Sequence, residues 1–384
     1  MRIFLSAGEP SGDLHGANLA RALLRARPGL ELHGFGGGRM AAAGCRLVYP
    51  LCDFAVIGFV QILASVPQFR RVLDRADAFF RASRPDAVVL IDYPGFHWWL
   101  ARRARAHGIP VFFFVPPQVW AWASWRVRKM RRLVDHVLCV LPFEGPWFRQ
   151  RGISAEYVGH PYFDELPAQR LDAAFMAEQR GRPGTVVALL PGSRNQELDH
   201  SLEPLLQAAE IVHARRPDVR FLFACLHEKH ARRAEARLRG RRLRAEAHAG
   251  RTAEVIQLAH STISVSGSVG LELLYRGKPS VVFYKQHWLS VLIAKRLMMC
   301  SPHISIVNLL AGRELLPEYL TSRCEPEPLA EHTLRWLEDR HAYERLCGEL
   351  AELRRRVAEP GACDRAAGRL LALLDGPAGA LTAA

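Results

Sequence analysis

The sequence predicts an α/β fold made of two successive parallel-sheet domains, and three observations support this prediction. Short apolar runs alternate with helical stretches, as at residues 3–7 and 14–27, which is typical of βαβ units in a parallel sheet. The same pattern restarts after the Gly/Pro-rich stretch at 181–184. The chain has 384 residues, which corresponds to two domains at roughly 100–200 residues each.

The first half contains four apolar runs that we expect to be strands. Each run is rich in Val, Ile, Leu or Phe and is followed by a turn that contains glycine or proline, and both features favour strands. The runs cover residues 3–7, 87–91, 111–115 and 136–140. The helical stretch 14–27 follows the first run, so the chain is predicted to open with a βα unit.

The second half repeats this arrangement, with strands expected at residues 186–190, 221–224, 261–265 and 280–284. A helix after the first of these strands carries apolar residues on one stripe at the 3.6-residue period. The stripe consists of Leu202, Leu205, Leu206, Ala209 and Val212. We therefore expect Rossmann-like domains at 1–165 and 166–340, followed by C-terminal helices at 341–384.

The charge and the ends of the chain limit the classes of function. Lys and Arg number 52 against 38 Asp and Glu, for a net charge of +14, which favours phosphate-bearing partners such as nucleotides, nucleic acid or an anionic membrane. No signal peptide is expected at the N-terminus, and no apolar run reaches the ~18 residues of a transmembrane helix. The eight scattered cysteines indicate reduced thiols. The HEKH sequence at 227–230 lacks zincin spacing, so no metal site is expected there.

The loop after the first strand reads Gly-Glu-Pro-Ser-Gly-Asp at 8–13. Ligands of doubly wound sheets bind at the carboxyl ends of the strands, where this loop is expected to lie. The loop lacks the GxGxxG spacing of a dinucleotide site. Two interpretations stay open here: a ligand loop, or a turn in which Ser11 or Asp13 caps the following helix.

Asp92 follows the strand expected at 87–91, in the sequence Ile-Asp-Tyr-Pro-Gly-Phe-His. A carboxylate at the end of a buried parallel strand faces the ligand crevice and is a candidate general base. The alternative is an Asp that binds backbone N–H groups of the Pro-Gly turn. His97 could be a second proton-transfer group, but we favour an ordinary polar residue.

Two further strand-end loops indicate phosphate binding. In the Leu-Pro-Gly-Ser-Arg sequence at 190–194, Arg194 offers a bidentate fork for phosphate, the alternative being a surface arginine. In 264–272, small residues open a helix whose N–H groups can face an anion, and Glu272 could accept hydrogen bonds from ribose hydroxyls. The alternative for the glycines is close packing of the helix against the sheet.

A dense apolar segment at 54–69 is followed by Arg70 and Arg71. Further basic runs lie at 102–105 and 126–132. An apolar segment beside basic residues can dock on an anionic membrane surface. The alternative is a core helix with a solvated face, which is the commoner arrangement.

Taken together, the motifs resemble those of the lipid-A-disaccharide synthases, which are inverting glycosyltransferases of the GT-B class. The matching pieces occur in order over roughly residues 1–330: GEPSGD at 8–13, IDYPGF at 91–96, PPQVWAW at 116–122, LPFE at 141–144, GHP at 159–161, LPGSR at 190–194, SGSVGLE at 266–272 and NLLAGRE at 308–314. The resemblance implies two Rossmann-like domains facing a central cleft, an N-terminal domain for the acceptor and the membrane, and a C-terminal domain for the UDP-sugar donor.

The resemblance also implies the reaction and its setting. The enzyme would transfer 2,3-diacylglucosamine from UDP-2,3-diacylglucosamine to 2,3-diacylglucosamine 1-phosphate (lipid X), giving the β-1,6 tetraacyl disaccharide 1-phosphate and UDP. No metal and no cofactor are implied. The expected location is cytoplasmic, at the inner face of the cytoplasmic membrane and on its anionic surface. A homodimer that exchanges C-terminal segments is possible; otherwise these helices are expected to pack back on the N-terminal domain.

Residue roles follow from the same resemblance. Asp92 is expected to remove the proton of the acceptor 6-hydroxyl, and Arg194 to meet the charge on the leaving diphosphate. The expected substrate-binding residues are Glu9, Ser11, Gly12, Asp13, Ser266, Gly267, Ser268, Glu272, Asn308 and Arg313.

Other functions are compatible with parts of the sequence. Another GT-B transferase or a UDP-sugar epimerase would use the same donor half, but a soluble substrate requires no lipid-docking segment such as 54–69. A basic nucleic-acid-binding protein would need aromatic residues interleaved with a basic stripe, which Trp120, Trp122 and Trp125 beside 126–132 offer only faintly. The ordered motifs disfavour this alternative, and nucleic acid is not an expected partner.

Overall fold

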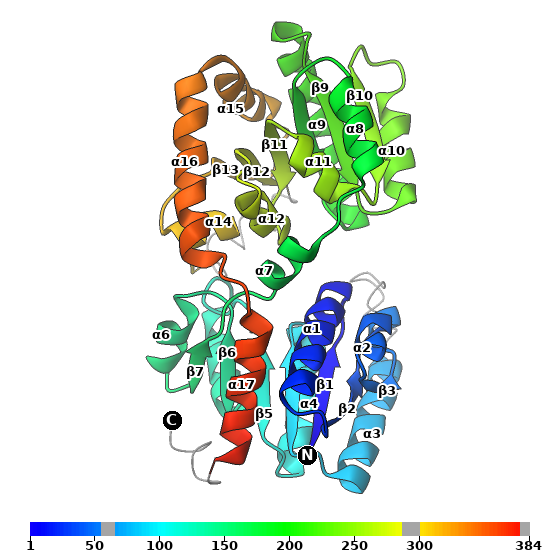
Figure 1. Ribbon diagram of the computed structural model, residues 1–384, viewed down its shortest axis with the longest axis vertical. Coiled ribbons are helices and arrows are strands. Elements are labelled where there is room, and N and C mark those ends of the chain that lie inside the picture. The colour runs from blue at the N-terminus through cyan, green and yellow to red at the C-terminus, as the bar shows by residue number, and fades with distance from the viewer. Residues whose placement is uncertain (55–65, 286–299, 377–384) are drawn as a thin grey trace. The chain divides into compact units, whose positions relative to one another are not determined.

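The computed structural model describes residues 1–54, 66–285 and 300–376. Contacts divide the chain into two compact units. Unit 1 combines residues 1–167 with the segment from residue 359 onward, and unit 2 covers residues 168–358. Figure 1 labels most of the helices and strands of both units.

Unit 1 contains a seven-stranded parallel sheet in the order β3-β2-β1-β4-β5-β6-β7. Its strands are β1 (Arg2–Ala7), β2 (Glu31–Phe35), β3 (Arg46–Tyr49), β4 (Ala87–Ile91), β5 (Val111–Phe114), β6 (His136–Cys139) and β7 (Ala155–Tyr157). Its helices are α1 (Pro10–Ala26), α2 (Gly38–Ala42), α3 (Val66–Ser83), α4 (Pro94–Ala106), α5 (Val127–Leu133), α6 (Glu144–Arg149), α7 (Tyr162–Glu165) and α17 (Ala362–Asp375), with short 3-10 turns at Leu51–Phe54 and Ser124–Arg126.

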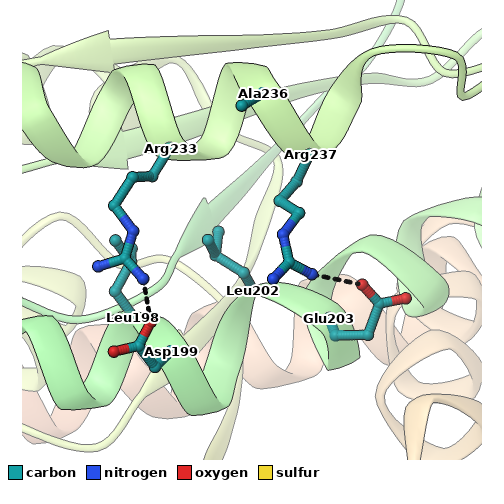
Figure 2. A pocket seen from close by; sticks show the side chains of 7 residues that line it. All are labelled: Leu198, Asp199, Leu202, Glu203, Arg233, Ala236 and Arg237. Carbon is teal, nitrogen blue, oxygen red and sulfur yellow. Dashed lines mark hydrogen bonds and ion pairs between the residues drawn. The ribbon is translucent and has the colours of Figure 1, made fainter.

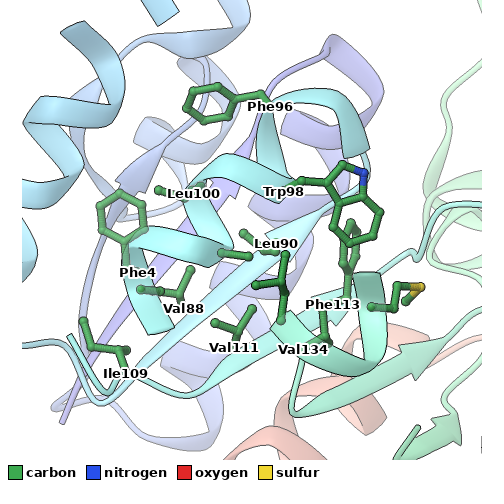
Figure 3. Packing of buried hydrophobic residues seen from close by; sticks show 14 of the residues in the cluster. Phe4, Val88, Leu90, Phe96, Trp98, Leu100, Ile109, Val111, Phe113 and Val134 are labelled. Carbon is green, nitrogen blue, oxygen red and sulfur yellow. The ribbon is translucent and has the colours of Figure 1, made fainter. Parts of the chain in front are cut away.

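The core of unit 1 lies where the central strands meet α4. Strands β4 and β5 are buried along their whole length, as expected for parallel strands covered on both faces. Figure 3 shows Trp98 of α4 packed against Phe113 of β5, in a core cluster that also includes Leu90, Phe96 and Leu100. Burial of this apolar surface fixes the strand ends that carry the site described below.

Unit 2 contains a six-stranded parallel sheet in the order β10-β9-β8-β11-β12-β13. Its strands are β8 (Val186–Leu190), β9 (Arg220–Cys225), β10 (Ala245–Ala249), β11 (Ser261–Val265), β12 (Ser280–Lys285) and β13 (Glu318–Thr321). Its helices are α8 (Ala173–Gly181), α9 (Asn195–Arg215), α10 (Glu228–Leu238), α11 (Thr252–Leu258), α12 (Val269–Tyr275), α14 (Ile306–Ala311), α15 (Pro326–Glu338) and α16 (Arg340–Val357).

All eight predicted strands are confirmed, each to within one residue at either end. The predicted apolar stripe of α9 is also confirmed, since its five residues are all buried. The sequence did not reveal β2, β3, β7, β10 and β13. Four of these are the outermost strands of their sheets, and an outer strand that is only half-buried, such as β10 or β13, needs no continuous apolar run.

The C-terminal helix α17 belongs to unit 1, where it packs against α1. The carboxylate of Asp164 accepts hydrogen bonds from the backbone N–H groups of Gly361 (2.5 Å), Ala362 (3.0 Å) and Cys363 (2.8 Å) at the start of this helix. The sequence placed the start of the C-terminal helices at 341, whereas α16 packs with α12 and α15 of unit 2 and the return to unit 1 comes at residue 359.

The apolar segment predicted at 54–69 lies largely outside the described residues, which resume at residue 66. The membrane-docking prediction for that segment therefore has no structural description. In the described ranges, none of the helices combines the length and the apolar composition that crossing a bilayer requires.

Candidate active site

The strand order of unit 1 brings four loops to one edge of its sheet. Strands β1, β4, β5 and β6 are neighbours and run parallel, so the loops that follow them share the carboxyl edge. Ligands of doubly wound sheets bind at such an edge. Glu9 follows β1 and Asp92 follows β4, and these two predicted site residues therefore lie on adjacent loops.

The loops after β1 and β4 pack directly against each other. A Cβ atom on Gly8 would lie 2.1 Å from Cδ1 of Tyr93, so only glycine at position 8 leaves room for the tyrosine ring. Burial, followed by the negative charge of Glu9, raises the pKa of Tyr93. The phenol of Tyr93 therefore stays protonated near neutral pH and can act as a hydrogen-bond donor.

The residues of the 8–13 loop divide into an outer and an inner set. Glu9 is half-buried and Ser11 is exposed, whereas Asp13 is buried within α1. The carboxylate of Asp13 accepts hydrogen bonds from the N–H groups of Gly37 (2.7 Å), Arg39 (3.1 Å) and Met40 (3.1 Å). The interpretation in which Ser11 or Asp13 caps the following helix is therefore contradicted, because α1 has no side-chain cap at its N-terminus. Asp13 caps α2 instead.

Gly12, the remaining predicted residue of this loop, is buried beside the ends of two strands. A Cβ atom there would lie 3.4 Å from both Cβ of Ala7 and the carbonyl oxygen of Ile91. These are ordinary van der Waals distances, so the start of α1 lies close to the carboxyl ends of β1 and β4 without requiring glycine at this position. Direct contact of Gly12 and Asp13 with a substrate stays a prediction.

Asp92 occupies a strained position immediately after β4. Its φ angle is 52° and that of Tyr93 is 48°, and the left-handed region is costly for residues other than glycine. The backbone N–H of Asp92 donates to the carbonyl of Phe114 (3.4 Å), and its carbonyl accepts a hydrogen bond from Nδ1 of His97 (2.6 Å). Asp92 itself is half-buried, which is compatible with a carboxylate that reaches a ligand at this edge.

His97 is fully buried, and its Nε2 atom lies 2.9 Å from Oγ of Ser6 in β1. Burial lowers the pKa of His97 to about 4, so the imidazole is neutral at neutral pH. A ring enclosed in this way cannot exchange a proton with a ligand at the sheet edge. The structure therefore favours the ordinary polar role for His97 over a second proton-transfer group.

The loops after β5 and β6 are fastened together by a buried carboxylate. The first loop is bracketed by two further left-handed residues, Val115 (φ 54°) and Ala123 (φ 53°). Glu144 accepts hydrogen bonds from Nε1 of Trp120 (2.9 Å) and from the backbone N–H groups of residues 140–141 (2.9 Å each). Burial raises the pKa of Glu144 to about 7. The PPQVWAW and LPFE motifs thus form one locked segment of the sheet edge.

In unit 2, strands β8 and β11 are neighbours, so the 190–194 loop and the 266–268 loop lie side by side at the carboxyl edge. Arg194 is the N-terminal capping residue of α9. Glu197 accepts from the backbone N–H groups of Ser193 (2.9 Å) and Arg194 (3.1 Å), and its second oxygen lies 3.1 Å from Nη1 of Arg194. The side chain of Arg194 is 69% exposed, so an anion at this edge can reach the guanidinium.

The 266–268 loop presents small exposed residues at the same edge. Gly267 and Ser268 are exposed, and Ser266 is anchored because its hydroxyl donates to the carbonyl of Ile304 (3.1 Å). A Cβ atom on Gly267 would meet nothing within 4 Å, whereas one on Gly270 would lie 3.0 Å from Cγ2 of Ile306. The packing interpretation of the glycines therefore applies to Gly270, and Gly267 keeps the ligand interpretation.

Three other predicted donor residues lie in structural contacts. Glu272 is buried and pairs with Arg276 (2.9 Å), so its proposed contact with ribose stays a prediction. Asn308 is fully buried, and its amide binds the backbone of residues 315–316 through three hydrogen bonds of 2.8–2.9 Å. Arg313 is exposed and pairs with Glu349 (3.2 Å). Asn308 therefore shapes a loop of unit 2.

The sequence did not reveal three carboxylates that hold these loops: Glu144, Glu197 and Glu318. Glu197 had a usable signal, because a Glu three residues after the capping position is the capping-box spacing. Glu144 lies within a motif that the sequence singled out, but nothing in a sequence says that its carboxylate points inward. Glu318 fastens the 303–305 loop through His303 Nδ1 (3.0 Å) and two backbone N–H groups, and had no signal.

A groove elsewhere in unit 2 is lined by α9 and α10. Figure 2 shows two arginines of α10 that reach carboxylates of α9, pairing Arg233 with Asp199 and Arg237 with Glu203. The groove lies along the helices and its charges pair across it. We therefore place the candidate site at the strand ends. Within the described residues, no group of three or more His, Cys, Asp or Glu side chains could hold a metal ion.

Sequence comparisons give one consistent result. Residues 3–366 match the family described as Lipid-A-disaccharide synthetase. The lipid-A-disaccharide synthase of Anaeromyxobacter dehalogenans strain 2CP-1 is 37% identical over 374 residues, covering 97% of each chain. That of Myxococcus xanthus strain DK1622 is 36% identical over 376 residues, again covering 97% of each chain.

Solved structures resemble this fold at low sequence identity. UDP-GlcNAc 2-epimerase from Neisseria meningitidis, bound to UDP-GlcNAc, matches with a TM-score of 0.62 at 11% identity, covering 97% of this chain and 99% of the epimerase. MurG of Acinetobacter baumannii matches with a TM-score of 0.57 at 14% identity, covering 97% of this chain and 99% of MurG. Both likenesses concern the fold alone, which is that of two Rossmann-like parallel-sheet domains.

Proposed function

Because the chain belongs to the lipid-A-disaccharide synthetase family, and is thus a glycosyltransferase of lipid A disaccharide synthesis, we propose its substrates and the residues that act on them. The donor is UDP-2,3-diacylglucosamine and the acceptor is 2,3-diacylglucosamine 1-phosphate. The products are the β-1,6-linked tetraacyl disaccharide 1-phosphate and UDP. The observation that carries the assignment is the family match over nearly the whole chain, with Asp92 and Arg194 both at strand ends.

Asp92 is the proposed general base. Its carboxylate takes the proton of the acceptor 6-hydroxyl while that oxygen forms a bond with the anomeric carbon of the donor. The bond between this carbon and the UDP oxygen breaks on the opposite face, so the configuration inverts. The left-handed backbone at Asp92 and Tyr93 supports this role, because strained residues cluster at active sites.

Unit 2 is proposed to bind the UDP moiety. Negative charge grows on the diphosphate as the bond to the sugar breaks, and the Arg194 guanidinium and the N–H groups at 266–268 are the groups that would meet it. Loss of one such preorganised contact costs about 2.7–4 kcal/mol of barrier. The proposed reaction requires no metal ion.

We also propose that unit 1 associates peripherally with an anionic membrane. Trp99 of α4 is 56% exposed and Trp125 is 58% exposed, and the guanidinium of Arg102 lies over the Trp99 ring at 4.9 Å. Helix α5, which packs against α4, has an exposed basic face formed by Arg128, Lys129, Arg131 and Arg132. Exposed tryptophan beside basic residues suits the headgroup region of a bilayer.

Vesicle sedimentation tests this association. The protein should pellet with phosphatidylglycerol vesicles and remain in solution with phosphatidylcholine vesicles at low salt. The double variant Trp99→Ser, Trp125→Ser should bind more weakly than Leu226→Ser, which removes an exposed apolar side chain of unit 2. Equal binding by both variants would rule out the α4–α5 face.

A homodimer that exchanges C-terminal segments stays a prediction, which light scattering at several concentrations tests.

The central experiment incubates the protein with both acylated glucosamine substrates and detects the disaccharide and UDP by mass spectrometry. We expect both products in equal amounts, and neither with Asp92→Asn at the same time point. Consumption of the UDP-sugar without disaccharide would contradict the transferase reaction. Conversion of UDP-N-acetylglucosamine to its 2-epimer without an acceptor would support the epimerase alternative instead.

A further inference from the structure

The peptide that carries the proposed base depends on a side chain from the core. Asp92 and Tyr93 are successive non-glycine residues with positive φ, a backbone region that is costly for residues other than glycine. A free strand end would relax toward an ordinary backbone conformation. Contacts on the peptide groups of Asp92 therefore contribute to the direction in which its side chain leaves the sheet edge.

The buried side chain of His97 supplies one such contact. Its Nδ1 atom lies 2.6 Å from the carbonyl oxygen of Asp92 and its Nε2 atom 2.9 Å from Oγ of Ser6. Ser6 is fully buried in β1 and pairs with Leu90 in the register of β1 and β4. The imidazole thus joins the peptide after Asp92 to a neighbouring strand of the central sheet.

The chemistry of the two contacts fixes the tautomer. A carbonyl oxygen only accepts hydrogen bonds, so Nδ1 must carry the proton. The ring is neutral because it is buried, so Nε2 is an acceptor and the hydroxyl of Ser6 donates to it. Both ring nitrogens are satisfied by this arrangement, and neither can take part in a proton exchange with the substrate.

We propose that His97 is a positioning residue for the transfer reaction, which holds the strained peptide of Asp92 so that the carboxylate is presented at the sheet edge. This inference rests on the proposed function, since it requires that Asp92 be the base. Its effect is expected on the rate of the chemical step and not on substrate binding, because the imidazole of His97 is fully buried.

The test compares two substitutions at position 97 with a matched control. His97→Leu keeps much of the volume and removes both hydrogen bonds. His97→Asn places an amide nitrogen where Nδ1 lies and can still donate to the Asp92 carbonyl. The control is His136→Leu, because His136 is also buried and bonded to a serine hydroxyl (Ser154, 2.7 Å), but it begins β6 at the opposite end of the strand from the site.

We expect His97→Leu to lower kcat by about 10²-fold, the loss typical of a displaced reacting group. The KM values and the pH of the acid limb of the rate profile should stay unchanged, and His97→Asn should recover most of kcat. His136→Leu should lower the midpoint of urea unfolding comparably to His97→Leu and leave kcat unchanged. An equal loss of kcat in the two leucine variants, or a rise in KM in place of a fall in kcat, would overturn the inference.

A double variant separates this inference from the proposed function. If His97 acts through Asp92, Asp92→Asn combined with His97→Leu should be no slower than Asp92→Asn alone, because residues that act as a unit are non-additive. Additive losses would show that His97 acts by another route while Asp92 remains the base. Full activity of Asp92→Asn alone would instead reject the proposed base, whatever His97→Leu does.

Discussion

The carboxyl edges of the two sheets differ in where they place left-handed backbone. Among the described residues, unit 1 holds five non-glycine residues with positive φ, and four of them follow β4 or β5: Asp92, Tyr93, Val115 and Ala123. In unit 2 the positive-φ positions described are glycines, including Gly192 beside Arg194. Unit 1 therefore stores strain at the edge that carries the proposed base, and unit 2 turns its chain with the residue that adopts this conformation at no steric cost.

This difference matches the roles proposed for the two edges. A strained loop persists only when its surroundings over-determine it, and in unit 1 His97 and Glu144 do so through buried hydrogen bonds. Proton transfer needs a base within a narrow range of positions, which justifies that cost. In the proposed mechanism the exposed small residues at 267–268 of unit 2 would need only to present N–H groups to a flexible diphosphate.

The largest effect on activity should come from removing the charged side chain at the carboxyl edge of each sheet. Asp92→Asn should lower kcat by about 10²–10⁴-fold, the range for loss of a general base, and leave the affinity for UDP unchanged. Arg194→Ala should weaken UDP binding, slow the transfer, or both. Single-turnover kinetics and calorimetric titration with UDP measure the two effects. A near-normal single-turnover rate in Asp92→Asn, or unchanged kinetics in Arg194→Ala, would remove that residue from the mechanism.

Acid should destabilise unit 1 before unit 2. The described part of unit 1 holds four histidines whose pKa burial lowers to about 4 or about 3, against one in unit 2; they are His15, His97, His136 and His160, against His260. An unfolded histidine titrates near pH 6.5, so below that pH the unfolded chain binds protons that the folded unit does not. A pKa difference of one unit is worth about 1.4 kcal/mol, and the stability of unit 1 should fall between pH 6.5 and about 4.

One carboxyl works in the opposite direction. The pKa of Glu144 is raised to about 7, so its contribution to stability is present at low pH and is lost as pH rises from about 4.5 to 7. It offsets part of the histidine effect but not four imidazoles. Hydrogen exchange corrected for the intrinsic rate at each pH reads the two units separately. Loss of protection in unit 2 first, or in both at one pH, would contradict the predicted order.

A smaller effect, on the free energy of unfolding, is expected at Gly192 of unit 2. Gly192 has φ 99°, and a Cβ atom there would lie 2.7 Å from Cβ of Glu197. Gly192→Ala should therefore lower the free energy of unfolding by about 1–3 kcal/mol and disturb the cap that holds Arg194. Gly267→Ala is the control, since its added Cβ meets nothing within 4 Å. Equal unfolding midpoints in urea for the two variants would contradict a strain effect at Gly192.

The smallest effect should be found at a strained alanine of unit 1. Ala123→Gly removes the strain of a left-handed non-glycine residue, which is worth roughly 1–2 kcal/mol. It also removes a buried methyl group and increases the conformational entropy of the unfolded chain. These effects oppose each other, so the net change in the free energy of unfolding should be near zero. Ala101→Gly, in the buried interior of α4, has no strain to relieve and should cost about 1–2 kcal/mol. Urea unfolding measures both; an equal cost at the two positions would show that the backbone at Ala123 carries no strain.

Apolar pattern alone predicted the central strands and the buried stripe of α9, because burial on both faces of a parallel sheet demands continuous apolar runs. It also placed Asp92 and Arg194 at strand ends, since a strand that ends in a turn fixes the position of the next residue. The resemblance to a family, rather than any single motif, indicated the reaction.

The remaining features depend on contacts between distant residues. Nothing near Asp13 in the sequence indicates that its carboxylate binds the start of α2, 24 residues or more away. The position of Glu272 in the sequence predicts a residue that faces a ligand, but in the structure Glu272 forms a buried ion pair with Arg276. Left-handed φ at Val115 or Ala123 contradicts the local preference of these residues, so only the surrounding packing can determine it.

The place of α17 has a consequence for the order in which the protein can be made. Its buried face, which includes Ala366, Ala367 and Leu370, covers α1 of unit 1, yet it leaves the ribosome after all of unit 2. At about 5–20 residues per second, synthesis of the intervening chain takes on the order of 10–40 s. Throughout that interval the first-made unit must wait with part of α1 uncovered, while unit 2, being continuous in sequence, can finish folding first.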